Sequence, residues 1–193
     1  MNYTEYPSVS KILRATESEK SKAFLKDWAD RIGIEAAAQI KEDSMARGTV
    51  IDNNVAEYFV TGDCDNKMIK TYLQQFKIIE NEQDVWSDIY KYKGRFDQLM
   101  EKDGRLLLND FKGSGKLKQK QWLGDNPVQL AAYYFALHER GVKVDYAQLS
   151  YVVDGQKDIQ KFVFGLPELK KYYDEFLERL KQYNENSISC QSS

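Results

Sequence analysis

The sequence predicts an α/β fold in which helices flank a mixed β-sheet, and two observations carry this prediction. Near both ends of the chain and after Asn126, apolar residues recur every three or four positions, which is the period of an amphipathic helix. Residues 78–112 and 146–164 instead carry short runs of β-branched and aromatic residues broken by turn sequences, which indicates strands. Helices, strands, one helix, further strands and a last helix in this order are typical of a sheet covered by helices.

The N-terminal part of the chain is predicted to be helical. Over residues 8–38 the apolar residues fall three or four apart, and Ser8 or Ser10 is suited to cap the first helix. Another helix is expected after Gly48, because an apolar residue recurs at every fourth position until the pattern stops near Gly62.

A short helix over residues 68–76 is expected to lead into antiparallel strands. Residues 78–112 have the composition of strands, and Lys102-Asp103-Gly104 interrupts them with a sequence typical of a hairpin turn. The strands on either side of this turn are therefore expected to pair with each other.

A further helix is expected after the hairpin. Asn126 is suited to cap its free amides, and Pro127 is suited to the first helical position. Gly141 is expected to end this helix in the left-handed conformation.

The C-terminal part is predicted to contain two strands and a helix. The strands are expected at Tyr146–Val153 and Lys161–Phe164, around a turn at residues 154–155. The helix begins at Pro167, and its apolar residues form one stripe: Leu169, Tyr173, Phe176 and Leu180.

The composition is that of one ordinary globular domain. Of the 193 residues, 42% are hydrophobic and 30% are charged, which excludes wholesale disorder. No apolar run approaches the roughly 20 residues that cross a bilayer, so no membrane partner is expected. We expect a single domain over residues 1–184, followed by a polar, disordered tail over residues 185–193.

The N-terminal sequence predicts an intracellular protein. It lacks the basic, then apolar, then small-residue order of a secretory signal. The cytoplasm of a bacterium or of a phage-infected host is the expected location. A net charge of -2 does not exclude nucleic acid as a partner, because a local basic groove is sufficient to bind it.

The few sulfur and imidazole ligands limit the metal chemistry. Cys64 and Cys190 cannot supply the four thiolates of an iron–sulfur cluster, so no such cluster is expected and both are expected to be free thiols. His138 is the single histidine, which excludes sites that need two imidazoles. Metal chemistry in this chain would therefore have to use carboxylates.

The residues best suited to chemistry lie on either side of the predicted hairpin turn. Asp97 and Asp110 would lie side by side on paired strands and supply the oxygen ligands that a hard divalent cation prefers. Alternation along the strand places Lys112 on the same face as Asp110, where its charge could stabilise a developing anion or orient a water molecule. The alternative is an exposed charged strand edge, because Asp-x-Lys is frequent by chance.

Over most of its length the sequence resembles the RecB-like branch of the PD-(D/E)XK nucleases, and within it the mitochondrial genome maintenance exonuclease group with its phage and bacterial relatives. Several matches in the same order are more specific than one triplet. The resemblance implies a restriction-endonuclease-like core, with a central mixed sheet flanked by helices and an N-terminal helical segment. The matches are Ser8–Leu13, Arg47–Asp52, Glu82, Gly94–Asp97, Asp110–Ser114 and Asp125–Tyr133.

The resemblance also implies a metal-dependent active site. Asp97, Asp110 and the backbone carbonyl of Phe111 would hold one or two Mg²⁺ or Mn²⁺ ions, and Lys112 would position or activate water. Glu82 aligns with an acidic residue that helps to form the metal site in some relatives. A solvated acid is the alternative for Glu82.

Residues after the catalytic strand match positions that meet the substrate in this branch. Gln129 and Tyr133 match its Gln-x-x-x-Tyr helix and, one helical turn apart, would share a face. The resemblance implies that the glutamine steadies the catalytic lysine or the substrate. Ser114 stands where the family has a small hydroxyl that could contact phosphate. Lys116 and Lys118 would fit a DNA backbone, and a solvated loop is the alternative.

One position departs from the family pattern. RecB-like relatives carry a metal-binding histidine four residues after the glycine of Arg47-Gly48, and this chain has Asp52 there. An aspartate can still bind Mg²⁺ or Mn²⁺, but it adds negative charge to the site. The alternative is that Asp52 is an exposed helix residue and that the site has lost a ligand. Arg47 of the same motif is expected to contact the substrate.

These features predict a metal-dependent exonuclease that hydrolyses single-stranded DNA in replication, repair or recombination. One alternative is an endonuclease or a duplex-processing recombination nuclease of the same superfamily, whose catalytic residues would be identical. Another is a catalytically impaired DNA-binding or assembly protein. An assay with circular DNA would distinguish the exonuclease from the endonuclease. A measurement of cation binding would test whether the protein is catalytically impaired. The sequence identifies no protein partner.

Overall fold

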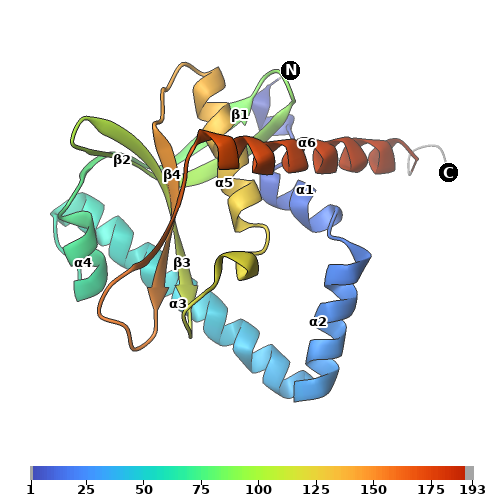
Figure 1. Cartoon of the computed structure of the whole chain (residues 1–193), viewed down its shortest axis with the longest axis horizontal. Helices are drawn as coiled ribbons and strands as arrows, with labels where there is room; N and C mark the ends of the chain where they lie inside the picture. The colour runs from blue at the N-terminus through green and yellow to red at the C-terminus, as the bar shows by residue number, and fades with distance from the viewer. Residues whose placement is uncertain (1, 190–193) are drawn as a thin grey trace.

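A mixed sheet forms the centre of the part of the chain that the computed structural model describes, residues 2–189 (Figure 1). Its strands lie in the order β1-β2-β3-β4-β5; β3 and β4 are parallel, and the other neighbours are antiparallel. A parallel pair needs a long crossover, and helix α5 (Asn126–Glu139) supplies it. The prediction of an α/β fold with a mixed sheet is confirmed. The strands are β1 (Lys77–Ser87), β2 (Tyr92–Lys102), β3 (Arg105–Ser114), β4 (Tyr146–Val153) and β5 (Gln160–Phe164).

The hairpin between β2 and β3 forms where the sequence predicts it. Asp103 and Gly104 have φ angles of 53° and 75°, the pair of left-handed residues that favours a tight two-residue turn. Lys102 and Arg105 pair directly on either side of them. The turn therefore fixes the register of the two strands that carry the predicted acids.

Helices cover both faces of the sheet (Figure 1). On one face, α1 (Val9–Ala15), α5 and α6 (Leu166–Ser189) enclose the larger apolar core. On the other face, α4 (Lys67–Leu73) and the second half of α3 (Ile34–Thr61) enclose a smaller core. The apolar stripe predicted for the last helix is buried: Leu169, Tyr173, Phe176 and Leu180.

Local signals set several helix ends. Ser8 caps α1, because its Oγ accepts a hydrogen bond from the N–H of Lys11 at 3.2 Å. Gly62, with a φ of 75°, ends α3 in the left-handed conformation. Gly141, with a φ of 85°, follows the end of α5 as predicted.

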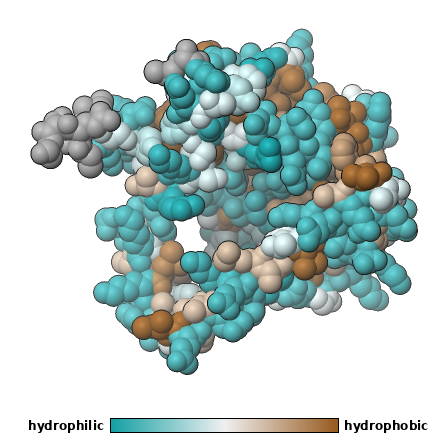
Figure 2. All heavy atoms as spheres, turned by 180° about the vertical axis from the view of Figure 1, so that it is seen from behind, coloured by the Kyte–Doolittle hydropathy of each residue, from teal (hydrophilic) through white to brown (hydrophobic). Residues whose placement is uncertain are grey.

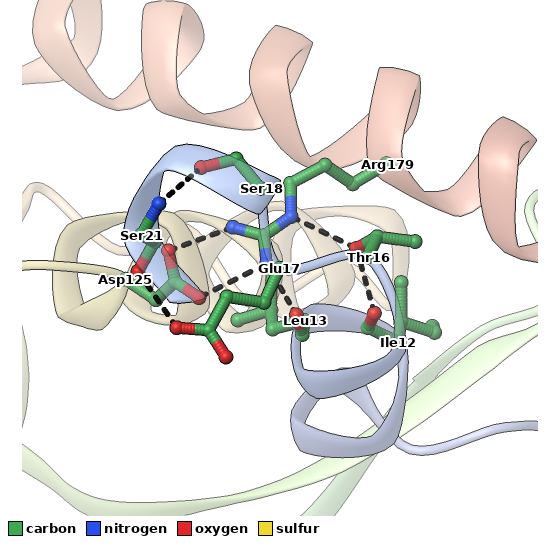
Figure 3. A network of polar contacts seen from close by, with 8 residues as sticks. All are labelled: Ile12, Leu13, Thr16, Glu17, Ser18, Ser21, Asp125 and Arg179. Carbon is green, nitrogen blue, oxygen red and sulfur yellow. Dashed lines mark hydrogen bonds and ion pairs between the residues drawn. The ribbon is translucent and has the colours of Figure 1, made fainter. Parts of the chain in front are cut away.

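Arg179 on α6 fixes the point where α1, α2 (Glu19–Ile32) and α5 meet (Figure 3). Its guanidinium donates to both carboxylate oxygens of Asp125 at 2.7 and 3.0 Å, to Thr16 Oγ1 at 2.9 Å and to the carbonyl of Leu13. The prediction that Asn126 caps α5 is wrong. Asp125 occupies the N-cap position, and the arginine holds its carboxylate away from the helix amides.

Helix α2 (Glu19–Ile32) and the first half of α3 form an arch that projects from the sheet (Figure 1). Gly33, with a φ of 92°, forms the corner between them. The helix expected to begin after Gly48 is part of α3, which continues unbroken from residue 34 to residue 61. The side chains of Phe24 and Leu25 are 64% and 50% exposed, because α2 packs mainly against α3 and not against the sheet. Figure 2 shows an opening through the molecule beside this arch.

The C-terminal helix is longer than the sequence indicates. It extends through Ser189, beyond the domain boundary expected after residue 184. The rest of the expected tail, including Cys190, lies outside the described residues. Cys64 is a buried free thiol. Within residues 2–189, no helix combines the length and the apolar character that crossing a membrane requires.

Candidate active site

The two predicted acids lie on neighbouring strands. Strands β2 and β3 pair as far as Gln98 and Asn109, and Asp97 and Asp110 are the next residues along each strand. Asp97 Oδ2 accepts a hydrogen bond from the backbone N–H of Phe111 at 2.8 Å. This bond ties the carboxylate of one strand to the backbone of the other. The hairpin therefore brings the two acids together.

Lys112 lies with these acids. Its ammonium is 2.7 Å from Oδ2 of Asp110, whose side chain is only 4% exposed. The two residues are two positions apart on β3, so their side chains leave the same face of the sheet. A positive charge thus stands beside two shielded carboxylates, where electrostatic interactions are stronger than in water.

These charged groups shift one another's pKa values. Burial and the charge of Asp110 raise the pKa of Asp97 to about 8, although Lys112 and the N–H of Phe111 oppose the shift. Burial alone would lower the pKa of Lys112, but the carboxylates of Asp110 and Asp97 outweigh it and raise that pKa above its ordinary range. Lys112 therefore keeps its proton at neutral pH, and a further cation near Asp97 would favour the ionised form of that carboxyl group.

A hollow of about 270 Å³ opens beside Asp97 and contains two further acids, Glu82 and Asp52. Burial raises the pKa of Asp52, and the charges of Glu82 and Asp110 raise it further, against the effect of Lys112. Asp52 is an exposed residue of α3, and it borders this hollow.

Glu82 reaches the hollow from a strained backbone conformation. Its φ of 49° lies in the left-handed region, which a non-glycine residue rarely adopts within a strand. In the register of β1 and β2 it falls opposite Asp97. Its carboxylate lies 3.9 Å from Nη1 of Arg95. Such strain is often found where a side chain is directed into a functional site.

The residues of this site fit a hard divalent cation by their chemistry. Carboxylates and the carbonyl oxygen of a strand are the ligands that Mg²⁺ and Mn²⁺ prefer. Oδ2 of Asp110 is buried and accepts no well-aligned hydrogen bond, even though Lys112 forms an ion pair with it. Within residues 2–189, no three carboxylate, imidazole or thiol groups lie close enough to share one ion. The side chains would therefore have to converge around a bound ion.

Gln129 and Tyr133 project from α5 toward the same region. Gln129 Nε2 donates to Tyr133 Oη at 2.9 Å and lies 3.3 Å from Ser10 Oγ. Burial and the charge of Asp110 raise the pKa of Tyr133 to about 12, while Gln129 and Lys112 oppose the shift. The glutamine thus contacts the tyrosine, and the tyrosine lies within electrostatic reach of the lysine.

The other predicted substrate residues lie around the end of β3. Ser114 is buried, and its hydroxyl donates to the carbonyl of Lys116 at 2.6 Å. The backbone N–H of Lys118 donates to Gln160 at 2.9 Å, which ties the lysine-rich loop to β5. The guanidinium of Arg47 lies 3.5 Å from the carboxylate of Asp154. Of these four side chains, that of Lys116 is the most open to solvent.

Arg95 is a member of the site that sequence reasoning missed. It lines the hollow, and its Nε lies 3.1 Å from Oδ1 of Asp84. Strand alternation gives the signal that could have found it, because Arg95 stands two residues before Asp97 and leaves β2 on the same face.

A buried polar layer lies behind the two acids, on the face of the sheet that α4 covers. Ser150 donates to Asn109 Oδ1 at 2.6 Å, and Gln148 donates to the hydroxyl of Tyr72 at 2.6 Å. Asn109 in turn donates to Gln98 at 3.2 Å. These bonds join β2, β3, β4 and α4, so a slip in strand register would leave buried polar groups without partners.

Three comparisons place the chain among known proteins. The sequence profile of the PD-(D/E)XK nuclease superfamily matches residues 11–191. The chain is 27% identical over 209 aligned residues to mitochondrial genome maintenance exonuclease 1 of Mus musculus; the match covers 93% of this chain but 59% of that protein's length.

Two solved structures are also similar to this chain. A candidate exonuclease of Eubacterium rectale has 12% identity and a TM-score of 0.45, with coverage of 93% of this chain and 79% of that one. An alkaline exonuclease of Laribacter hongkongensis has 9% identity and a TM-score of 0.42, with coverage of 97% and 93%.

Proposed function

The chain belongs to the PD-(D/E)XK nuclease superfamily, and from that premise we propose that it is a metal-dependent exonuclease that hydrolyses linear single-stranded DNA. One observation carries the catalytic part of the proposal. Asp97, Asp110 and Lys112 form one cluster on a strand pair, with the lysine ammonium 2.7 Å from the second acid. Burying several charged groups together is costly unless they are used or fully paired.

Mg²⁺ or Mn²⁺ is the proposed cofactor. Asp97, Asp110 and the carbonyl of Phe111 would hold it, and Asp52 and Glu82 line the same hollow as Asp97. When bound, such an ion would polarise the phosphate and lower the pKa of a water molecule.

Lys112 has a role that does not require it to lose a proton. Because the carboxylates raise its pKa, it is a cation at neutral pH and acts as a hydrogen-bond donor. From this position it orients the attacking water and stabilises the charge that develops on the phosphate. Asp110 fixes the direction of the ammonium through their ion pair. Gln129 holds Tyr133 beside this pair, where the phenol can donate to a phosphate oxygen.

The opening beside the arch supports a preference for single strands with a free end. Figure 2 shows that the arch and the body of the molecule enclose this opening. A flexible strand can enter an enclosed passage by its end, whereas a closed circle could enter only as a doubled loop or after the arch detaches. Arg47 and the basic loop with Lys116 and Lys118 would then contact the phosphate backbone.

A cleavage assay with three matched proteins tests the proposal. End-labelled single-stranded DNA is incubated with native protein, Lys112→Ala and the exposed-site control Lys143→Ala, each with Mg²⁺, Mn²⁺ or a chelator. We expect metal-dependent cleavage that falls at least about a hundredfold in Lys112→Ala, a typical loss for a group that stabilises developing charge, and is unchanged in Lys143→Ala. Failure of the native protein to cut DNA with either metal would overturn the proposal and favour a DNA-binding role.

A further inference from the structure

A second hollow, of about 430 Å³, adjoins the proposed active site. It shares Arg95 with the acidic hollow and is bounded on another side by Gln129 and Tyr133. Its remaining walls come from the N-terminal segment with Tyr3 and from the beginnings of α1 and β2. A hollow of this size is in the range that accommodates a small ligand.

A column of stacked groups ends at this hollow. The rings of Tyr3 and Trp86 stack with centroids 4.0 Å apart and an angle of 10° between their planes. The guanidinium of Arg140 lies 3.5 Å from the centroid of Trp86. Two groups this close to one ring must occupy its opposite faces, so Trp86 lies between them. Tyr3 is therefore the end of the column, and it lines the hollow.

The N-terminal segment that carries Tyr3 is anchored to the sheet. The backbone N–H of Lys93 donates to the carbonyl of Pro7 at 3.0 Å, and the ammonium of Lys93 donates to the carbonyl of Thr4. Tyr3 itself lies in a short 3-10 turn that Asn2 caps. The end of the stack is thus held in place before any ligand arrives, which reduces the entropy lost on binding.

The charged groups of this hollow favour an anion. Lys93 and Arg95 both line it, and Asp84 is the acid among its lining residues. Asp84 pairs with Arg95 at 3.1 Å, whereas Lys93 has no carboxylate partner in the part of the chain that the structure describes. The ammonium of Lys93 is therefore not neutralised by a carboxylate, and it lines the same hollow as the ring of Tyr3.

We propose that this hollow binds one nucleotide of the DNA strand next to the bond that is cut, with its base stacked on Tyr3 and its phosphate contacted by Lys93 and Arg95. The inference rests on the proposed nuclease function and adds a substrate subsite to it. Stacking on an aromatic ring accepts any base, so the subsite would position DNA without reading its sequence.

Fluorescence of a base analogue tests the subsite independently of cleavage. Short single strands carry 2-aminopurine, whose fluorescence falls on stacking, at each position in turn. They are titrated with Lys112→Ala and with the same protein that also carries Tyr3→Leu or Tyr3→Phe. Thermal melts confirm that the three proteins are equally folded.

The subsite predicts strong quenching at one position of the strand. Tyr3→Leu should abolish that quenching and weaken binding about tenfold, as loss of a base–aromatic stack does, whereas Tyr3→Phe should retain both. Lys93→Met should weaken binding and reduce its salt dependence, and the neighbouring substitution Lys91→Met should not.

Two negative results have different meanings. Equal quenching and affinity in the protein that keeps Tyr3 and in its Tyr3→Leu and Tyr3→Phe variants would overturn the subsite, whatever the native protein cuts. Normal position-specific quenching in a chain whose native form cuts no DNA would leave the subsite standing and overturn the nuclease function.

Discussion

At the scale of single residues, the protonation of Asp97 links the proposed chemistry to stability. Its pKa is raised to about 8 by burial and by the charge of Asp110. The unfolded chain ionises this group near its ordinary value of 3.8. The folded chain therefore holds the proton of Asp97 more tightly than the unfolded chain does. Protonation of Asp97 stabilises the fold fully below the pKa of the unfolded chain, and this stabilisation is lost as the pH rises through the pKa of the folded chain. In the absence of metal, Asp97 therefore destabilises the fold progressively between about pH 4 and pH 8.

Asp97→Asn should remove this pH dependence. Without metal, the melting temperature of the native protein should fall relative to that of the variant as pH rises from about 6 to about 9. Mn²⁺ favours the ionised carboxylate, so it should stabilise the native protein more at the higher pH and leave the variant almost unaffected. Asp103→Asn, in the exposed hairpin turn, is the matched control. Parallel melting curves for native protein and Asp97→Asn, with and without Mn²⁺, would show that this carboxylate is not a metal ligand.

The sequence could predict the positions of some site residues but not the contacts of others. Asp97, Asp110 and Lys112 could be brought together because a hairpin turn and strand alternation fix their positions relative to one another. The contact of Gln129 with Ser10 could not be predicted, because a helix position sets the direction of a side chain but not the neighbour that it meets on another element. The cap of α5 was misassigned for a related reason: the arginine that holds Asp125 is 54 residues away in the chain.

At the scale of elements, one close contact between a glycine and an aromatic ring fixes the position of α5 against the sheet. A Cβ atom added at Gly94 of β2 would lie 2.1 Å from Cε1 of Tyr133, a distance that non-bonded carbon atoms do not tolerate. The ring of Tyr133 therefore packs directly on the strand backbone, and this contact sets the distance between α5 and the two acids.

Gly94→Ala should push α5 away from β2. We expect a loss of about 1–3 kcal/mol in the free energy of unfolding, measured by urea denaturation, together with slower cleavage because Tyr133 is displaced. Gly115→Ala is the control, since its added Cβ would meet its nearest atom, Oδ2 of Asp154, at an ordinary 3.7 Å. Equal stability of the two variants would contradict this packing.

The elements themselves were largely predictable, with one instructive exception. The hairpin, the strand Tyr146–Val153 and the last helix follow from turn residues and from hydrophobic periodicity. The continuity of α3 does not follow in the same way, because Gly48 weakens the helical signal in its middle. No neighbouring atom lies within 4 Å of a Cβ added at Gly48, so this glycine lies on an open face of the helix.

At the scale of the whole molecule, the chain divides into a packed sheet with its helices and an arch that stands apart from it (Figures 1 and 2). The apolar residues of α2 recur with helical periodicity, yet Phe24 is 64% exposed. Periodicity identifies an apolar face but does not identify what covers it. The arch and its opening could therefore not be predicted from the sequence, whereas the sheet and its mixed topology could.

The proposed function depends most on hydrolysis of DNA strands that enter the site by an end. Native protein and Mn²⁺ are therefore given equal amounts of a linear single strand and of the same strand closed into a circle. Lys112→Ala serves as the control for contaminating nucleases. We expect the linear strand to be progressively shortened while the circle stays intact. Cleavage of the circle at a comparable rate, absent in the control, would refute entry by an end and assign an endonuclease to this fold.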